Sequence, residues 1–379
     1  MAQTVFAPWE DPEQKPLIEF RNVTKRFGEF TAIDDLSLNI YEREFFALLG
    51  PSGCGKTTMM RMLAGFESVT EGHIWLGGQD IISVPPNKRP VNMMFQSYAL
   101  FPHLSIWDNI AFGLRRESKD KAMIEERVEE MLRLTRLTKF AKRKPHQISG
   151  GQRQRVALAR SLAKAPKLLL LDEPLGALDL KLREAMKIEL KLLQHQFDTT
   201  FVYITHDQSE ALVMSDNVAI MNEGKFVQIG TPQDLYHNPS AAFVAGFVGD
   251  TNRWAGKVTR IENGAVEVAT EAGLTMRGSV RGAGAPGVGD TVSAFVRPEF
   301  ITAEKAGGST RPADPTHNVI NGKVDSILFN GANSRILVRD GAGELIEADV
   351  VLTGGTQDLK PKDDVMLSWS PEQTMSFKV

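Results

Sequence analysis

One loop constrains the fold of this chain more than any other feature of its sequence. Residues 50–58 read GPSGCGKTT and match the G-x-x-x-x-G-K-[ST] pattern of a phosphate-binding loop. The apolar run Phe45–Leu49 precedes the loop and predicts a strand, and the segment from Thr57 to about Ala64 predicts a helix. Glycines let the backbone N–H groups of such a loop point at phosphate, at the positive end of the helix dipole. The sequence therefore predicts a strand–loop–helix unit that binds a nucleotide.

The loop supplies most of the predicted nucleotide ligands. Lys56 is expected to reach the β- and γ-phosphates, and the Thr57 hydroxyl is expected to bind Mg²⁺. The alternative, a glycine-rich turn that only starts a helix, leaves the lysine and the strand–helix context unexplained. Cys54 is expected to be a small filler within the loop rather than a redox sensor. The expected phosphate contacts come from Gly50, Pro51, Ser52, Gly53, Cys54, Gly55, Lys56, Thr57 and Thr58.

Two acidic residues end a second apolar run. The sequence LLLLDEP places Asp172 and Glu173 directly after Leu168–Leu171. Ligands of open α/β sheets bind at the carboxyl ends of the parallel strands, so both carboxylates are expected beside the phosphate loop. Asp172 is suited to hold Mg²⁺, and Glu173 is suited to polarise the attacking water as general base. The alternative is an acidic turn that follows a strand without a ligand.

A third segment separates this chain from other phosphate-loop proteins. Residues 149–155 read SGGQRQR, in which Ser149 is a good N-cap and Gly150 and Gly151 expose backbone N–H groups at the start of a helix. A helix start of this kind can bind an anion. Alone, the segment is better interpreted as a capped helix without a ligand, but the neighbouring motifs reverse that choice. It resembles the signature sequence of ABC ATPases, with Ile148 where leucine is more usual.

Further motifs follow in the order of the ABC ATPase family, and the resemblance covers nearly all of Leu17–Val248. Gln96, in MMFQSYALFPHLS, resembles the Q-loop glutamine, which senses Mg²⁺ or the lytic water and couples to the transmembrane partner. Asp179, in GALD, resembles the D-loop aspartate. His206 resembles the switch histidine that contacts the γ-phosphate, although an isolated histidine there would be interpreted as a surface residue. Phe27, in KRFGEF, stands where the family places an aromatic ring against adenine; tyrosine is commonest there, and the alternative is a core phenylalanine.

The resemblance also implies a dimer that binds ATP and Mg²⁺. In this family two domains meet head to tail, and each ATP lies between the phosphate loop of one copy and the signature segment of the other. The residues implied to complete that nucleotide site are Ser149, Gly150, Gly151, Gln152 and Asp179. The implied Mg²⁺ ligands are Thr57, Gln96 and Asp172. The implied catalytic residues are Glu173, His206 and Gln96.

The remaining patterns predict an α/β fold followed by an all-β domain. The runs 45–49, 168–172 and 201–205 are typical of strands buried on both faces of a mostly parallel sheet with helical crossovers. Charged and apolar residues alternate at helical spacing from Asp120 to about Leu137 and predict a helical insert. The sequence NEGKF at 222–226 predicts a hairpin turn.

Three parts are therefore expected along the chain. Residues 1–16 contain three prolines, do not form a secretory signal, and are expected to be a flexible leader. Residues 17–249 are expected to form the ABC ATPase domain, with a helical subdomain at about 97–165. Residues 250–379 are rich in glycine and in short alternating valine runs, which predict a small β-rich domain. This region resembles the OB-like transport-associated domain of importer ATPases, and Arg297-Pro298-Glu299 matches a motif of that domain.

Composition restricts the possible partners. The net charge is −3 and no basic block is sustained, so nothing in the composition argues for nucleic-acid binding. The single cysteine fits a reducing cytosol. No run of about 18 apolar residues is present, so any membrane role requires a partner. The importer resemblance implies a second copy, permease subunits and, indirectly, a periplasmic or extracellular solute-binding protein, at the cytoplasmic face of the inner membrane. The stretch from Tyr98 to Leu114 suits a groove for a permease coupling helix; core packing is the alternative, and both are expected in part.

The cargo is predicted only from resemblance. The segments FAKRKPHQISGGQRQR, NMMFQSYALFPH and VAGFVGDTN are most similar to polyamine (putrescine/spermidine) importer ATPases. Maltose-type, ferric-iron and sulfate importer ATPases share the core motifs and remain alternatives. A soluble ABC ATPase of translation or DNA repair is a further alternative, but such proteins usually carry two cassettes or a long coiled coil. Because the binding protein and permease select the cargo, no residue of this chain is predicted to form a polyamine pocket.

Overall fold

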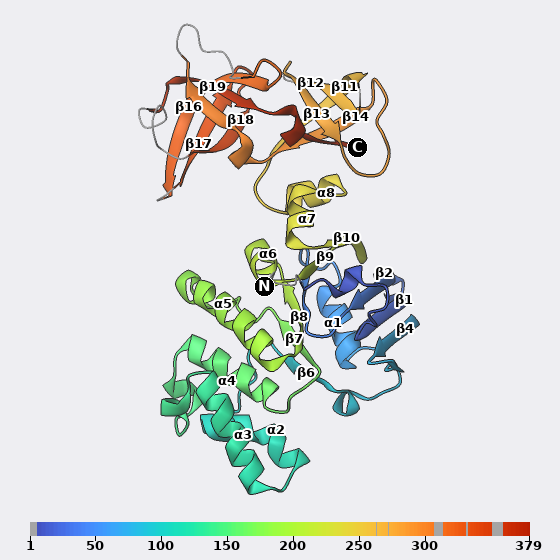
Figure 1. Ribbon diagram of the computed structural model, residues 1–379, viewed down its shortest axis with the longest axis vertical. Helices are drawn as coiled ribbons and strands as arrows, with labels where there is room; N and C mark the ends of the chain where they lie inside the picture. Colours follow the sequence, from blue (N-terminus) through green and yellow to red (C-terminus); the bar gives the residue numbers. More distant parts are fainter. Residues whose placement is uncertain (1–5, 263, 272, 307–313, 331–332, 351–358) are drawn as a thin grey trace. The chain divides into compact units, whose positions relative to one another are not determined.

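The computed structural model of this chain divides into two compact units, Met1–Gln233 and Asp234–Val379 (Figure 1). The structure describes residues 6–262, 264–271, 273–306, 314–330, 333–350 and 359–379. The first part of the expected leader, residues 1–5, lies outside the described residues, and the remainder includes a 3₁₀ helix, η1 (Pro8–Glu10). Within the described part of the chain, no helix combines the length and apolar character needed to cross a membrane.

A six-stranded sheet forms the centre of the first unit. Its strand order is β10-β9-β3-β8-β7-β6, and all neighbouring pairs are parallel except β10 with β9. The strands are β3 (Phe45–Leu49), β6 (Val91–Met94), β7 (Leu168–Asp172), β8 (Thr200–Thr205), β9 (Asn217–Asn222) and β10 (Lys225–Gly230). The predicted strands at 45–49 and 168–172 are confirmed, the one at 201–205 begins one residue earlier, and the predicted hairpin joins β9 to β10.

The same unit contains a second, antiparallel sheet that the sequence patterns do not predict. Its order is β2-β1-β4-β5, and its strands are β1 (Ile18–Phe27), β2 (Phe30–Ile40), β4 (Glu71–Leu76) and β5 (Gln79–Asp80). The pairing of β1 with β2 shifts register three times between Phe20 and Arg26. Each shift interrupts the two-residue alternation of buried and exposed side chains, which removes the sequence signal for these strands.

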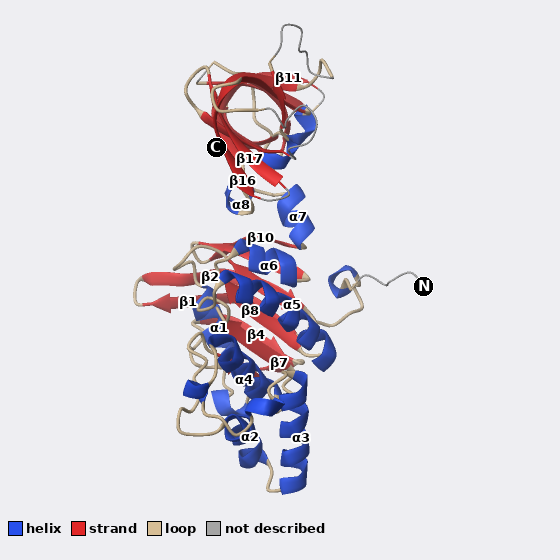
Figure 2. Ribbon diagram, turned by 90° about the vertical axis from the view of Figure 1, so that its left-hand side faces the viewer, coloured by secondary structure: helices blue, strands red, loops and turns tan. Residues whose placement is uncertain are grey.

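Helices cover both faces of the six-stranded sheet, and Figures 1 and 2 show α1 and α5 on opposite sides of it. Leu168 and Leu170 of β7 face the core that contains α1, whereas Leu169 and Leu171 face the core that contains α2 to α5. This double burial explains the uninterrupted apolar run. The helices are α1 (Lys56–Ala64), α2 (Ile106–Glu117), α3 (Lys121–Leu134), α4 (Gly150–Leu162), α5 (Leu180–Phe197) and α6 (Gln208–Met214), with short 3₁₀ helices η2 (Pro86–Lys88), η3 (Thr138–Phe140) and η4 (Pro145–Gln147).

The predicted helical insert is confirmed as α3. Asp120 caps its N-terminus by accepting hydrogen bonds from the backbone N–H groups of Ala122 and Met123. The periodic apolar residues are buried, and they are Ile124, Val128, Met131 and Leu132. Together with α2 and α4, α3 forms one apolar cluster that continues onto the six-stranded sheet.

The second unit consists of a closed barrel and a five-stranded sheet, and Figure 2 shows the barrel as a ring of strands. The barrel order is β11-β12-β13-β20-β14, and the sheet order is β15-β19-β16-β17-β18. The parallel rings of Trp254 in β11 and Trp369 in β19 stack 5.8 Å apart in the core that joins them. The strands are β11 (Asn252–Glu262), β12 (Ala265–Thr270), β13 (Thr275–Val280), β14 (Thr291–Val296), β15 (Thr302–Lys305), β16 (Asn318–Asn330), β17 (Asn333–Asp340), β18 (Leu345–Val350), β19 (Asp364–Trp369) and β20 (Met375–Lys378), with 3₁₀ helices η5 (Pro298–Phe300) and η7 (Pro371–Gln373).

The division between the units falls earlier than the expected boundary after Gly249. Helix α7 (Pro232–His237) spans the division, and α8 (Ala242–Phe247) belongs to the second unit. Ala245 of α8 packs into one apolar cluster with Phe295, Met375 and Phe377 of the barrel. These side chains, which are far apart in sequence, place the segment after Gln233 with the barrel.

Arg297, the first residue of the Arg-Pro-Glu motif, binds the segment that contains α7 and α8. Its side chain is fully buried, and it donates hydrogen bonds to the carbonyl oxygens of Tyr236, Ala245 and Asp250 at 3.2–3.3 Å. The guanidinium also lies 4.4 Å from the centre of the Tyr236 ring, and the Tyr236 hydroxyl donates to Glu299. The motif therefore fastens the segment containing α7 and α8 to the barrel.

Candidate nucleotide site

One group of the predicted site residues gathers at the carboxyl ends of four adjacent parallel strands. The phosphate loop follows β3, His206 follows β8, Asp172 and Glu173 end β7, and Gln96 follows β6. The strand registers bring these ends level, because Leu49 pairs with Thr205, Asp172 with Ile204, and Met94 with Leu171. Residues separated by more than 150 positions in sequence thus share one edge of the sheet, where open α/β sheets bind ligands.

Glycines shape the phosphate loop. Gly53 and Gly55 have φ angles of 81° and 110°, which side-chain-bearing residues rarely adopt. A Cβ atom on Gly50 would collide with the carbonyl oxygen of Met221 in the neighbouring strand β9. Thr57 is exposed in the first turn of α1, and Thr58 is half-buried beside it. Backbone N–H groups at this helix start lack partners within the helix, so they suit an anion.

Lys56 lies at the centre of this loop. Its Nζ donates hydrogen bonds to the carbonyl oxygens of Gly50 at 2.8 Å and Pro51 at 2.9 Å, and it lies 3.7 Å from the Sγ of Cys54. The side chain is 6% exposed, and Cys54 is also buried, in the core that contains α1. Neutral carbonyls orient the ammonium group without cancelling its charge. A buried positive charge therefore faces the place where phosphate is expected.

Glu173 joins two other predicted residues through both of its carboxylate oxygens. Its Oε1 lies 3.0 Å from Nδ1 of His206, and its Oε2 accepts a hydrogen bond from Nε2 of Gln96 at 3.2 Å. Glu173 has a φ of 44°, and its backbone N–H donates to the carbonyl oxygen of Ile204. The side chain of His206 is 60% exposed, so its ring also faces outward from the strand end. Side chains from three strand ends are thus assembled around one carboxylate.

Asp172 lies beside this cluster in a partly buried position. Burial raises the pKa of Asp172 above its usual range, and the neighbouring negative charge of Glu173 raises it further. The positive charges of Arg61 and Lys56 oppose this shift in part. Two adjacent carboxylates therefore concentrate negative charge next to the phosphate loop, which favours a bound cation.

A buried network behind His206 is missed by sequence reasoning. Glu210 is 3% exposed and accepts hydrogen bonds from the hydroxyls of Tyr203 at 2.7 Å and Thr205 at 2.6 Å. Thr205 in turn accepts from the backbone N–H of Asp207 at 2.9 Å. The network fixes the backbone on both sides of His206. A tyrosine within a buried strand was the available signal, because a buried hydroxyl requires a partner.

Ser149 caps helix α4 as predicted. Its Oγ accepts a hydrogen bond from the backbone N–H of Gln152 at 3.3 Å, and Oε1 of Gln152 accepts from the backbone N–H of Ser149 at 2.9 Å. A Cβ atom on Gly151 would lie 2.8 Å from a methyl carbon of Leu182, whereas Gly150 has nothing within 3.7 Å. Asp179 caps α5 by accepting from the backbone N–H of Leu182.

The signature segment (149–152) and the phosphate loop (50–58) make no direct hydrogen bond or ion pair with each other in the described part of the chain. The start of α4 is therefore fixed by its own capping contacts and not by contacts with the loop.

Phe27 lies at the end of β1 and is 46% exposed. This exposure excludes the alternative that Phe27 is a core residue. The Nζ of Lys25 lies 4.7 Å from the centre of its ring. The remaining exposed surface of the ring is available for stacking.

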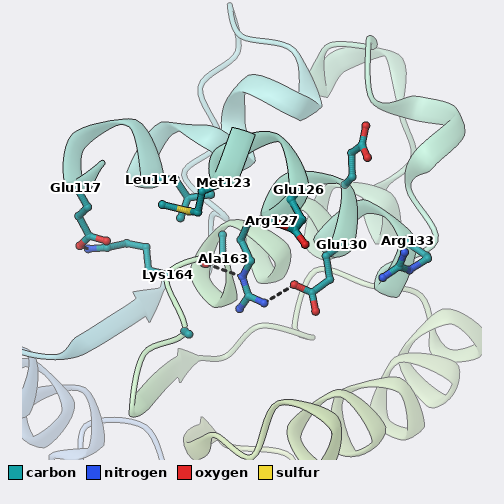
Figure 3. Close-up of a pocket in the computed structure, with 11 residues that line it drawn as sticks. Leu114, Glu117, Met123, Glu126, Arg127, Glu130, Arg133, Ala163 and Lys164 are labelled. Atoms are coloured by element: carbon teal, nitrogen blue, oxygen red, sulfur yellow. Dashed lines mark hydrogen bonds and ion pairs between the residues drawn. The ribbon is translucent and has the colours of Figure 1, made fainter. Parts of the chain in front are cut away.

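A depression of about 580 Å³ lies elsewhere, on the helical insert (Figure 3). Its lining includes Arg127, which donates hydrogen bonds to the carbonyl oxygens of Leu162 and Ala163 at the end of α4 and pairs with Glu130. Lys164 pairs with Glu117 on the same surface. None of the predicted site residues lines this depression. Its charged groups join neighbouring helices, and its lining is separate from the predicted site residues at the strand ends.

Comparison with known proteins decides the family. Residues 33–176 match the ABC transporter family, and residues 294–377 match the TOBE domain. The spermidine/putrescine import ATP-binding protein PotA of Rubrobacter xylanophilus is 48% identical over 358 residues, which are 94% of this chain and 93% of that protein. The chain belongs to the ABC transporter ATPases. Another relative of this ABC ATPase, the putrescine transport ATP-binding protein PotG of Escherichia coli, is 57% identical over 252 residues, covering 66% and 67% of the two chains.

Solved structures agree with this assignment for the first part of the ABC ATPase. The dimeric post-hydrolysis structure of the ATP-binding cassette MJ0796 with ADP and Pi is 31% identical, with a TM-score of 0.51 and coverage of 57% of this chain and 98% of that one. CbiO1 of Clostridium perfringens is 26% identical, with a TM-score of 0.56 and coverage of 59% and 91%. The predicted fold class, an α/β ABC ATPase followed by a small all-β domain, is confirmed. The chain is therefore an ATP-binding enzyme that hydrolyses ATP.

Proposed function

We propose that this ABC ATPase powers the import of a polyamine, putrescine or spermidine, through a membrane permease. One observation supports the hydrolytic step: the carboxylate of Glu173 is held by Gln96 and His206 at the same sheet edge as the Lys56 loop. The cargo is supported by the relatives that share nearly the whole chain and are described as spermidine/putrescine import proteins. The TOBE domain supports the importer type.

In this proposal the loop binds the phosphates of ATP. The ammonium of Lys56 would interact with the β- and γ-phosphates, and the N–H groups at the start of α1 would complete the contact. Phe27 would stack against adenine. Thr57, Gln96 and Asp172 would hold Mg²⁺, and their hard oxygen donors fit that ion. The negative charge of Glu173 beside the partly buried Asp172 is one that a bound cation would offset. When bound, Mg²⁺ would neutralise charge that develops on the phosphates.

Glu173 would act as the general base. A water molecule attacks the γ-phosphorus, its proton passes to the Glu173 carboxylate, and the bond to the β–γ bridging oxygen breaks to release ADP and phosphate. Gln96 and His206 keep this carboxylate oriented, which reduces the reorganisation needed at the moment of attack. The outward-facing ring of His206 would contact the γ-phosphate.

The proposed working form is a dimer of two such chains. Ser149, Gly150, Gly151, Gln152 and Asp179 would complete the site around ATP held by the partner's loop. This arrangement is supported by the solved cassette MJ0796, which is described as dimeric, and by the capped helix start at Ser149, whose backbone N–H groups suit an anion. Permease subunits, with a solute-binding protein on the far side, would place the dimer at the cytoplasmic face of the inner membrane. The stretch from Tyr98 to Leu114 would receive a coupling helix.

A reconstituted complex tests the cargo. ATP turnover should rise when putrescine or spermidine is supplied with the cognate binding protein, and it should not respond to maltose or ferric iron with theirs. Stimulation by a sugar, iron or sulfate and silence toward polyamines would refute the polyamine assignment while leaving the ATPase intact. Failure of the chain to associate with any permease would instead favour a soluble ABC ATPase.

A further inference from the structure

The loop that carries Gln96 is joined to the turn that carries Glu173 by a second hydrogen bond. The hydroxyl of Tyr98 donates to the carbonyl oxygen of Pro174 at 3.2 Å, and Tyr98 is 8% exposed. Burial raises the pKa of Tyr98, so the hydroxyl keeps its proton and remains a donor. Pro174 is buried and directly follows Glu173. The two segments are therefore connected twice, through the side chain of Gln96 and through that of Tyr98.

The backbone on both sides of this bond is in the left-handed region. Tyr98 and Ala99 have φ angles of 62° and 43°, and Glu173 has a φ of 44°. Residues with side chains rarely adopt this region, and they persist there only where surrounding contacts hold them. The positions of Gln96 and Glu173 thus depend on the contacts made by the neighbouring residues.

Arg160 of helix α4 makes such contacts. Its Nη1 donates to the carbonyl oxygen of Ala99 at 2.8 Å, and its Nη2 donates to that of Tyr98 at 3.1 Å. The guanidinium lies 5.5 Å from the centre of the Phe101 ring, which limits its freedom. Because α4 begins at the Ser149 cap, Arg160 connects the signature helix to the Gln96 loop.

We propose that Tyr98 and Arg160 are positioning residues for ATP hydrolysis. Arg160 holds the Gln96 loop on α4, and Tyr98 sets the distance between that loop and the turn bearing Glu173. Neither side chain needs to touch the nucleotide for this role. The inference rests on the proposed role of Glu173 as general base. In this proposal the orientation of Glu173 depends on contacts that extend from the strand ends to the signature helix α4.

The substitution Tyr98→Phe tests this role, because it removes only the hydroxyl and keeps the buried ring. In the full chain, kcat for ATP should fall roughly 5- to 50-fold, since small misplacements of catalytic groups are costly. The KM and the affinity for a fluorescent ATP analogue should stay within about twofold, because the Lys56 loop is unchanged. Turnover is expressed per bound nucleotide, so a misfolded fraction does not lower it. The matched control is Tyr236→Phe, which removes a hydroxyl bonded to Glu299 in the second unit and should keep wild-type kcat.

A double-mutant cycle with Gln96→Ala separates positioning from general loosening. If Tyr98 acts by placing Gln96 against Glu173, the combined loss should be smaller than the product of the two single losses. Arg160→Ala should show the same fall in kcat at unchanged KM, and Arg160→Lys, which keeps one charged donor, should restore part of it. Wild-type kcat in Tyr98→Phe, or losses that multiply fully, would overturn the positioning role. Glu173→Gln assayed in parallel keeps the two claims apart: full turnover there would refute the proposed base itself.

Discussion

The Nδ1 atom of His206 lies 3.0 Å from Oε1 of Glu173, and the two side chains leave the ends of the adjacent strands β8 and β7. The other oxygen of Glu173 accepts a hydrogen bond from Gln96, at the end of β6. Side chains that follow three parallel strands thus meet at one carboxylate. Because the sheet itself sets the spacing of these strand ends, the orientation of this carboxylate is built into the fold.

Replacing this carboxylate should separate binding from hydrolysis. Glu173→Gln keeps the shape of the side chain, but it replaces one acceptor oxygen with an NH2 group and cannot accept a proton. ATP turnover should therefore drop by roughly 10²–10⁴, the usual contribution of a positioned general base. ATP affinity should remain near wild type. Phosphate release and fluorescent-nucleotide titration measure the two quantities. Retention of half the wild-type turnover would show that another group is the base.

Removing the loop lysine should weaken ATP binding itself. Lys56→Ala leaves the phosphate charge uncompensated, so ATP affinity should weaken on the order of 100-fold, as for a lost charge-assisted contact. The control is Lys225→Ala, an exposed lysine of the same unit that pairs with Asp34. It should bind ATP normally. Equal losses in both variants would indicate a general effect of net charge.

The signature serine should matter for dimer closure rather than for nucleotide capture. Ser149→Arg places a bulky side chain where close docking is needed, and we expect steric exclusion to outweigh any attraction of the added charge for phosphate. In the slowly hydrolysing Glu173→Gln background, the monomer should still bind ATP. It should fail to form the dimer that Glu173→Gln alone is expected to accumulate with Mg-free ATP on size-exclusion chromatography.

A second N-cap serine provides the control for this experiment. Ser105 caps α2 by accepting from the backbone N–H of Asp108 at 3.0 Å. Ser105→Arg therefore removes a comparable N-cap but leaves the signature segment intact. The Ser105→Arg variant should form the dimer. Loss of ATP binding by the Ser149→Arg monomer would mean that the segment serves its own nucleotide. Normal dimerisation would make it an ordinary capped helix.

Arg297 should contribute to the stability of the second unit and not to ATP binding. Arg297→Met removes the donors to three carbonyl oxygens, of which that of Ala245 is buried and those of Tyr236 and Asp250 are partly buried. A buried unsatisfied group typically costs about 1–3 kcal/mol. We expect a lower thermal transition for this unit by calorimetry, with unchanged nucleotide affinity. The exposed Arg277, which pairs with Glu267, provides the control: Arg277→Met should change stability by less than about 1 kcal/mol. Equal effects would contradict the fastening role.

Glu44 should make stability depend on pH. Its side chain is fully buried, and burial raises its pKa from 4.5 to about 7, although hydrogen bonds from Tyr41 and Asn217 oppose the shift. The folded state therefore holds a proton that the unfolded state releases. This stabilisation is complete below about pH 4.5 and is lost as pH rises to 7.

The variant Glu44→Gln should remove that dependence. Its free energy of unfolding should exceed that of the wild type by up to roughly 3 kcal/mol above pH 7, and the difference should shrink toward pH 5. Urea unfolding between pH 5 and pH 8 measures it. Glu42→Gln alters an exposed carboxyl two residues away and should follow the wild-type curve. Parallel curves for Glu44→Gln and the wild type would show that Glu44 does not titrate in this range.

The sequence by itself determined the phosphate loop, the helix caps and the strands of the parallel sheet, because each has a local pattern. The phosphate loop follows from glycine spacing and one lysine, and the caps at Ser149 and Asp179 follow from a polar residue before an apolar helix. The strands of the parallel sheet are recognisable because both of their faces are buried. Each of these features leaves its signal within a few consecutive residues, so the sequence by itself was sufficient to recognise it.

Only the tertiary structure decided how distant residues meet. Gln96 and His206 are 77 and 33 positions from Glu173, and the strand order of the sheet brings them to it. The register shifts in β1, the buried carboxyl of Glu44 and the three carbonyl oxygens that receive Arg297 likewise have no local signal. A buried polar group needs a hydrogen-bond partner, and the packing of the elements determines which group lies close enough to be that partner. The sequence around the polar group does not contain this information.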